Sequence, residues 1–333
     1  MAKFIFWLAS ILILAPLVAA QQYTITDLGT FSGGAVSQGN SINDLGQIAG
    51  YARYANYNAH GIYWSESVGL QNLGAIPPQT DFSVAQAINF FGDVVGYSDY
   101  DEIQNQHAVL WTGGVLHDLG TLPGGTSSQA NSINDNNDIA GWSNSATTGV
   151  HAVIWSRNGG IQDLGALAGG YSDGIGINLH RDVVGYAIAG DGSSVGFLWT
   201  SKAGMQQLPT LHGAYDNSAN GINNLGQIAG GSGSYAVLWQ NDKRHTLTSL
   251  GVISGQTWSS AFAINDIGQV VGWSGFRAFV WSQSNGIRDL NSQIPANSGW
   301  TLTAAYGINL VGQITGEGEI NGEQHGFLLT PVQ

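Results

Sequence analysis

The sequence predicts an all-β fold, a single seven-bladed β-propeller with four antiparallel strands in each blade. Two observations predict it. One unit of about 44 residues recurs seven times. The last segment of the unit stands at the start of the chain and is missing at its end, as a closed ring requires. No segment after residue 20 shows sustained helical periodicity, so the repeat must be built from strands and turns.

The clearest marker of the repeat is an Ile-Asn pair with a Gly seven residues after the Asn. Successive pairs are 42 to 46 residues apart. The pairs are Ile42-Asn43, Ile88-Asn89, Ile133-Asn134, Ile177-Asn178, Ile222-Asn223, Ile264-Asn265 and Ile308-Asn309. Seven copies with the same internal spacing are not a chance pattern, and each copy is therefore one structural unit.

Each repeat contains four strand-length segments, which we name a to d. In the first copy, strand a ends at Ile42, strand b contains Ile48 to Gly50, strand c ends at Trp64 and strand d ends near Leu73. The turn between strands a and b has Gly as its third residue in five copies, as a left-handed backbone position needs. Asn137 and Arg181 take this place in the other two, and we expect Arg181 to distort its turn.

The order of the segments predicts how the ring closes. A strand d around Leu28 precedes the first strand a, and the chain ends just after the seventh strand c, where Leu329 replaces Trp. Tyr23 to Gly29 should therefore supply the outer strand of the last blade. A shared blade joins the two ends of the chain and leaves no open edge.

Strand a has small residues one and three positions before its Ile in every repeat, as at Ser41 and Gly39. Side chains alternate between the two faces of a strand, so we expect both small residues on one face. Blades crowd most near the axis of a propeller. Strand a should therefore be the innermost strand.

Three segments of the third repeat resemble the bacterial HAF extracellular repeat, which is named for a His-Ala-Phe tripeptide. They are Asp118 to Gly125, Ser132 to Asp135 and His151 to Ser156. The tripeptide itself is degenerate here, as in His151-Ala152-Val153 and Arg277-Ala278-Phe279. The resemblance covers residues 23 to 331 and implies an exported protein. It implies no catalytic residues.

Residues 1–20 have the features of a signal peptide. Lys3 precedes a mostly apolar run from Phe4 to Val18, and Val18-Ala19-Ala20 offers small residues for cleavage. The alternative is a membrane anchor, but the run is short for a spanning helix. We expect the mature protein to be one propeller domain, residues 21–333, with no membrane span, secreted to the periplasm or the exterior. The chain has no cysteine and therefore no disulfide.

Composition excludes one class of partner. Charged residues make up 9% of the chain, and the net charge is −13 with nine Lys plus Arg. Nucleic acid binding depends on cationic contacts, so we expect no nucleic-acid partner. The sequence has no motif for a cofactor, and we expect none. We expect a monomer that binds an extracellular glycan or protein.

Two groups of residues could suggest metal sites, but neither pattern fits one. His60, His107, His151 and His325 share one position at the start of strand c. Equivalent positions on stacked sheets lie roughly 10 Å apart, too far to share an ion, so we expect structural hydrogen bonds there. The acids around Asp99 and Glu317 do not match a calcium loop, and we expect them in solvated loops. No catalytic residues can be assigned.

The face that carries the b–c and d–a connections is the predicted functional face. The a–b turns are short and similar, whereas the b–c connections vary in length and content, and such variation usually marks the binding face of a repeat protein. Aromatic residues at the ends of these connections suit a glycan, because sugar rings have apolar faces and hydroxyl edges. The candidate ligand-binding residues are Tyr54, Tyr97, Trp142, Tyr186, Tyr215, Trp258, Trp273 and Trp300. Two alternatives stay open: a polysaccharide-active lyase or hydrolase, and a structural or adhesive module.

Overall fold

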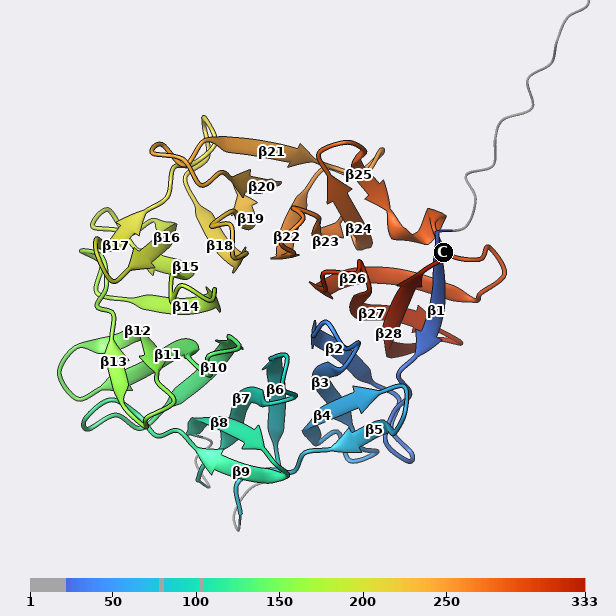
Figure 1. Ribbon diagram of the computed structural model, residues 1–333, viewed down its shortest axis with the longest axis horizontal. Coiled ribbons are helices and arrows are strands. Elements are labelled where there is room, and N and C mark those ends of the chain that lie inside the picture. The colour runs from blue at the N-terminus through green and yellow to red at the C-terminus, as the bar shows by residue number, and fades with distance from the viewer. Residues whose placement is uncertain (1–21, 78–80, 102–104, 333) are drawn as a thin grey trace, which may run out of the picture.

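The protein forms a ring of seven four-stranded antiparallel sheets around a central axis (Figure 1). The computed structural model describes residues 22–77, 81–101 and 105–332. The predicted seven-bladed propeller is confirmed. The predicted signal peptide lies outside the described residues.

The blades follow one another in chain order, each with its strands in the order a, b, c, d. The strands of blades 1 to 3 are β2 (Ser37–Ile42), β3 (Ile48–Arg53), β4 (Ala59–Ser65), β5 (Gly69–Asn72); β6 (Ser83–Ile88), β7 (Val94–Asp99), β8 (Gln106–Thr112), β9 (Val115–Asp118); β10 (Ser128–Ile133), β11 (Ile139–Ser145), β12 (Gly149–Trp155) and β13 (Ile161–Asp163). Those of blades 4 and 5 are β14 (Ser172–Ile177), β15 (Val183–Ile188), β16 (Ser194–Thr200), β17 (Gly204–Gln207); β18 (Asn217–Ile222), β19 (Ile228–Ser232), β20 (Tyr235–Trp239) and β21 (Leu247–Gly251). Those of blades 6 and 7 are β22 (Ser259–Ile264), β23 (Val270–Ser274), β24 (Arg277–Ser282), β25 (Gly286–Asp289); β26 (Trp300–Ile308), β27 (Ile314–Ile320), β28 (Glu323–Pro331) and β1 (Tyr23–Asp27), with the short 3-10 helix η1 (Leu290–Ser292) between blades 6 and 7.

Blade 7 is completed by the N-terminal strand, as predicted. β1 pairs antiparallel with β28, from Tyr23 opposite Pro331 to Asp27 opposite Phe327. A side-chain contact adds to the ladder, because Nδ1 of His325 lies 2.9 Å from a carboxylate oxygen of Asp27. The two ends of the described chain therefore meet in one sheet (Figure 1).

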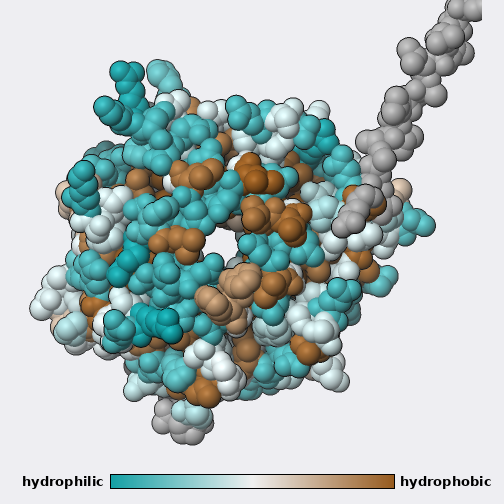
Figure 2. Space-filling view, in the orientation of Figure 1, coloured by the Kyte–Doolittle hydropathy of each residue, from teal (hydrophilic) through white to brown (hydrophobic). Residues whose placement is uncertain are grey.

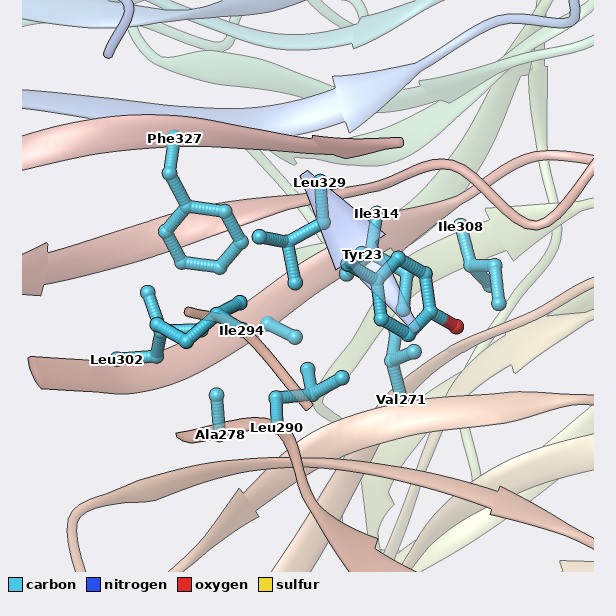
Figure 3. Packing of buried hydrophobic residues seen from close by; sticks show 11 residues of the cluster. Tyr23, Val271, Ala278, Leu290, Ile294, Leu302, Ile308, Ile314, Phe327 and Leu329 are labelled. Carbon is cyan, nitrogen blue, oxygen red and sulfur yellow. The ribbon is translucent and has the colours of Figure 1, made fainter. Parts of the chain in front are cut away.

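The core lies mainly between neighbouring blades. In the cluster of Figure 3, Val271 and Ala278 of blade 6 face Leu302 and Phe327 of blade 7. Tyr23 of β1 belongs to the same cluster and is 7% exposed. Each blade thus covers an apolar face of the next, and the N-terminal strand contributes to the last of these interfaces.

Strand a is innermost, as predicted, but its two small residues do not share a face. In blade 1 the ladder between β2 and β3 shifts register between Gly39 and Ser41, so Asn40 is an extra residue with no partner. This β-bulge interrupts the alternation of side chains. Ser41 and Asn40 line the axial channel, whereas a Cβ on Gly39 would lie 2.0 Å from Oγ1 of Thr315 in blade 7. Gly39 thus leaves room for the neighbouring blade, and Ser41 borders the channel.

The predicted distortion at Arg181 is wrong. Its φ is +65°, in the same left-handed region as the Gly of other a–b turns. Its amide donates to the main-chain oxygen of Asn178 at 3.1 Å, as in the glycine turns. The guanidinium lies 3.3 Å from a carboxylate oxygen of Asp138 in blade 3. The turn therefore keeps its shape, and Arg181 bears the strain of a conformation that Arg rarely adopts.

We expect Arg181→Asn to raise the free energy of unfolding by about 0.5–1 kcal/mol, because Asn adopts the left-handed region more readily than Arg. The lost ion pair with Asp138 is partly exposed and contributes little. Urea denaturation of both proteins measures the change. Arg157→Asn is the matched control, since it removes the same charge from an exposed turn without a positive φ. If Arg181→Asn were less stable than Arg157→Asn, the proposed backbone strain at Arg181 would be wrong.

Seven asparagine side chains join the blades into a closed ring. Nδ2 of each repeat Asn donates to the main-chain oxygen of the corresponding Asn in the next blade, at 2.9 to 3.4 Å. The last of these bonds runs from Asn309 back to Asn43 at 3.0 Å. Oδ1 of Asn43 accepts the amides of Leu45 and Gln47 in its own turn. The invariant residue of the repeat thus holds its own turn and ties it to the next blade.

Candidate functional site

A channel runs along the axis of the ring, and its wall combines polar and apolar side chains. Figure 2 shows the opening through the disc. The central cavity has a volume of about 470 Å³. The bulge residue of each strand a contributes to its wall: Asn40, Gln86, Asn131, Ile175, Asn220, Phe262 and Tyr306. Amide side chains and aromatic rings therefore border the same space.

A second cavity, of about 270 Å³, lies between blades 1 and 2 and shares Gln38, Asn40 and Gln86 with the channel. Its other lining residues include Tyr51 and Arg53, at the end of β3 where the b–c connection begins. This end of the channel therefore opens on the predicted functional face. We call it the channel mouth, lined by Gln38, Asn40, Tyr51, Arg53, Gln86, Tyr97 and Tyr306. Glu317 adjoins it, because the Tyr306 hydroxyl donates to this carboxylate.

A chain of hydrogen bonds orients the polar groups of the channel mouth. The Tyr51 hydroxyl donates to Oε1 of Gln38 at 3.2 Å, and Nε2 of Gln38 donates to Oδ1 of Asn40 at 2.7 Å. Nδ2 of Asn40 then donates to the main-chain oxygen of Ala85 in blade 2 at 2.8 Å. The side chains are thus positioned before any ligand arrives, which lowers the entropic cost of binding.

Glu317 is a carboxylate at a place where five other blades have an aromatic residue, the first position after the Gly of strand b. The Tyr306 hydroxyl donates to its Oε1 at 3.1 Å, and Nε2 of Gln324 donates to its Oε2 at 2.5 Å. Both donors are neutral. Burial raises the pKa of Glu317, and burial together with the Glu317 charge raises the pKa of Tyr306 and of Tyr51. The carboxylate therefore lies among phenol rings, and neither of its hydrogen-bond donors is a cation. Arg53 lines the same channel mouth, and its charge opposes that of Glu317 at Tyr51.

Asp173 is a second carboxyl group next to the channel wall, in blade 4. It is 7% exposed and accepts a hydrogen bond from Nδ2 of Asn131 at 2.9 Å. Burial raises its pKa to about 7, although the Asn131 bond acts in the opposite direction. The same amide also donates to the main-chain oxygen of Gly174 at 3.0 Å. Asp173 thus contributes to the contact between blades 3 and 4.

The structure disperses the eight predicted ligand-binding residues around the ring. Tyr97 lines the channel mouth. Tyr54 lies stacked on Phe31 with ring centroids 4.4 Å apart, and its hydroxyl accepts from Nδ2 of Asn72. Trp258 and Trp273 pack edge to face at 4.0 Å.

The remaining four also lie apart from one another. Trp142 is half-buried in β11, and the Tyr186 hydroxyl lies 3.1 Å from that of Tyr171. Tyr215 is 90% exposed on a d–a connection. Trp300 begins β26 and packs edge-on against Phe327 at 6.2 Å. Ligand contact at these eight residues stays a prediction.

Gln38, Asn40, Tyr306 and Glu317 are not among the ligand contacts predicted from the sequence. The detectable signal was the acid at Glu317, in a position that is aromatic in five of the other six blades. The expectation that Glu317 and Asp99 lie in solvated loops is wrong: they lie in β27 and β7, and Asp99 is buried.

The four repeat histidines have the structural hydrogen bonds that the sequence predicts. Nδ1 of His107 and of His151 lies 2.9 Å from a carboxylate oxygen of Asp118 and Asp163, on strand d of the same blade. In blade 6, Nε of Arg277 makes the equivalent contact with Asp289. The histidines of neighbouring blades do not converge on a common point.

The comparisons with known proteins support the fold and no more. No family model matches the chain, and no curated protein matches it. Among solved structures, virginiamycin B lyase from Staphylococcus aureus is 13% identical with a TM-score of 0.58, over 93% of this chain and 99% of that one. The extracellular domain of a putative one-component system from B. thetaiotaomicron is 8% identical with a TM-score of 0.57; the match covers 93% of this chain and 40% of that one. Among residues 22–77, 81–101 and 105–332, no helix has the length and apolar character to cross a membrane. The chain thus shares the β-propeller fold with these proteins. Any inference about its function must come from its own residues.

Proposed function

We propose that this protein is a secreted binding protein that recognises a glycan at the channel mouth. The observation that carries the proposal is a preformed cavity in which amide side chains alternate with phenol rings. Hydroxyl groups of a sugar both donate and accept hydrogen bonds, which suits Gln38, Asn40 and Gln86. The apolar faces of a sugar ring suit Tyr51 and Tyr97.

Glu317 favours a weakly basic glycan over a neutral one. A half-buried carboxylate with only neutral hydrogen-bond donors gains most from a cationic ligand group. Tyr51 and Tyr306 lie beside it, and aromatic rings attract an ammonium group. The net charge of −13 would also raise the local concentration of a cation. An unacetylated amino sugar provides both the hydroxyl groups and the ammonium.

The test is binding to an array of oligosaccharides that differ only in free or acetylated amino groups, followed by calorimetry. We expect Glu317→Gln to weaken binding of the free-amine form by roughly tenfold or more, the worth of a charge-assisted hydrogen bond, and that of the acetylated form much less. Glu319→Gln is the matched control, because Glu319 is an exposed acid two residues along the same strand. Melting of both variants should stay near that of the unmodified protein.

Several results would contradict the proposal. Equal losses for the free and acetylated ligands would reject the ammonium contact. Binding abolished by combined Ala substitution of Tyr54, Trp258 and Trp300, but unaffected at Glu317, would move the site from the channel mouth to the outer loops. Binding that maps to the turns of Asp44, Asp135 and Asp266 would place the ligand on the other face of the disc.

A polysaccharide-active enzyme is the second candidate, and the Glu317–Tyr306 pair favours it. A carboxyl group with a raised pKa, hydrogen-bonded to a phenol at 3.1 Å, is suited to proton transfer. Depolymerisation of polysaccharide mixtures by the purified protein, lost in Glu317→Gln, would favour the enzyme over the binding protein.

A further inference from the structure

Large apolar side chains surround the axis on the face opposite the channel mouth. They occupy the a–b turns, one or two residues after the repeat Asn, and are 40% to 69% exposed. They are Leu45, Phe90, Phe91, Leu179, Leu225, Ile267, Leu310 and Val311. In Figure 2, separate apolar patches lie around the central opening, with hydrophilic surface between them. We call this set the apolar ring; it takes members from six of the seven blades.

The turns themselves do not require these apolar residues. Blade 3 has Asp135 and Asn136 at the same places, and its turn makes the same hydrogen bonds, with Asn137 N to Asn134 O at 3.0 Å. A fold that accepts polar residues in one blade would accept them in the others. Exposure of apolar side chains to water is unfavourable. Their recurrence in six blades therefore indicates that another molecular surface covers them.

The polar groups beneath the apolar ring are already paired. Oδ1 of Asp44 accepts the amide of Leu310 at 2.8 Å, and Oδ1 of Asp135 accepts that of Phe90 at 2.8 Å. Oδ1 of Asp266 accepts the amide of Asn224 at 2.8 Å. These three acids line a cavity of about 250 Å³ at the axis, so a surface laid over the apolar side chains can leave their carboxylates in water.

The size of the apolar ring matches one side of a protein dimer. Side chains of this kind have on the order of 200 Å² each when fully exposed, so the ring offers roughly 900 Å² of apolar surface. This area is spread over six turns with Asp44, Asp135 and Asp266 between them, and its sum is close to the ~800 Å² per partner of a standard interface.

In place of the monomer expected from the sequence, we propose that a second copy of this chain covers the apolar ring, so that two propellers stack face to face through their a–b turns. The ring surrounds the axis, so a two-fold rotation that lies in the plane of contact places apolar side chains on apolar side chains. The inference does not depend on the identity of the ligand at the channel mouth.

The stacked dimer would have a functional consequence. Both channel mouths would point outward, in opposite directions, and each a–b end of the channel would be closed by the partner. Two outward sites let one dimer bridge two ligand chains or two surfaces, a geometry that gives avidity only when both sites can engage.

The test measures the mass of the mature protein in solution by sedimentation velocity from about 1 to 200 µM, the range where interfaces of this size associate. We expect twice the mass of one chain at the upper concentrations. Phe91→Ser combined with Val311→Ser should give the mass of a single chain throughout, with an unchanged circular dichroism spectrum. Tyr57→Ser combined with Tyr215→Ser is the matched control, because both tyrosines are at least 81% exposed outside the apolar ring. The control should stay dimeric.

A second measurement identifies the face. The chain has no cysteine, so a single introduced thiol is unique. A bifunctional maleimide should link two copies that carry Asn136→Cys, in the gap of the ring, and should not link two that carry Tyr215→Cys. A protein that is monomeric over the whole range overturns the proposal. So does a dimer that only the Tyr57 and Tyr215 pair disrupts, and so does a monomer that co-sediments with phosphatidylglycerol vesicles through Phe91 and Val311.

Discussion

Deletion of residues 23–29 is expected to abolish cooperative thermal unfolding or to cause aggregation at ordinary temperature. The deletion removes all five pairs between β1 and β28 and uncovers the edge of β28. It also removes Tyr23 and Leu28, which are 7% and 3% exposed and each stabilise the fold by about 1.5–3 kcal/mol. Total stability is about 5–15 kcal/mol, so a loss of this size is a large fraction of it.

Differential scanning calorimetry and light scattering measure this effect. Thr24→Ser combined with Thr26→Ser is the control, because both threonines are exposed and the strand is kept. A synthetic peptide of residues 22–30 added to the truncated protein should restore the transition by adding the missing strand. A truncated protein that melts like the intact one would show that the outer strand of blade 7 is dispensable.

Asp173→Asn is expected to stabilise the protein at pH 8 and to have little effect at pH 4. The folded state holds the pKa of Asp173 at about 7, whereas the ordinary value is 3.8. Below pH 3.8 both states bind the proton, and the burial costs nothing. Between pH 4 and 7 the unfolded chain loses the proton and the folded chain keeps it, so stability falls as pH rises. Above pH 7 the penalty is complete, about 4 kcal/mol at most.

Denaturant unfolding of both proteins at pH 4, 6 and 8 measures the effect. Asn at this position can still accept the hydrogen bond from Nδ2 of Asn131, so the contact between the blades survives. Asp216→Asn, at an exposed carboxyl on a d–a connection, is the control and should show no such trend. A gain that is as large at pH 4 as at pH 8 would mean that packing, and not ionisation, causes it.

Most of the fold could be predicted because the same pattern of strands and turns occurs seven times in the sequence. The Ile-Asn spacing defines the blade, and the phase of Leu28 against Leu329 defines the closure; β1 and β28 confirm it. The bulge at Asn40 could not be found this way. It occurs in every copy, so comparison among repeats shows no irregularity, and period-two alternation then assigns Gly39 and Ser41 to one face.

The candidate site was harder to predict, because it depends on residues that differ between repeats. Tyr97 was selected and lies at the channel mouth, but the rule that selected it also chose Tyr54, which is stacked on Phe31. Glu317 and Asn40 reach the mouth through the curvature of the ring, which brings blades 7 and 1 together from opposite ends of the chain. Sequence spacing contains no information on that distance until the ring is closed.

The pairing of β1 with β28 also determines when the protein can finish folding. Thr24 bonds Thr330 across 306 positions of chain, and His325 reaches Asp27 across 298. Contacts so remote in sequence cannot form until the last blade exists, and the entropy of closing so long a loop must be met before they contribute. Blades 1 to 6 can assemble in turn as the chain emerges, while the first strand waits unpaired for the last. The final step of folding is therefore the meeting of the two ends, and it sets how long an exposed β-edge persists.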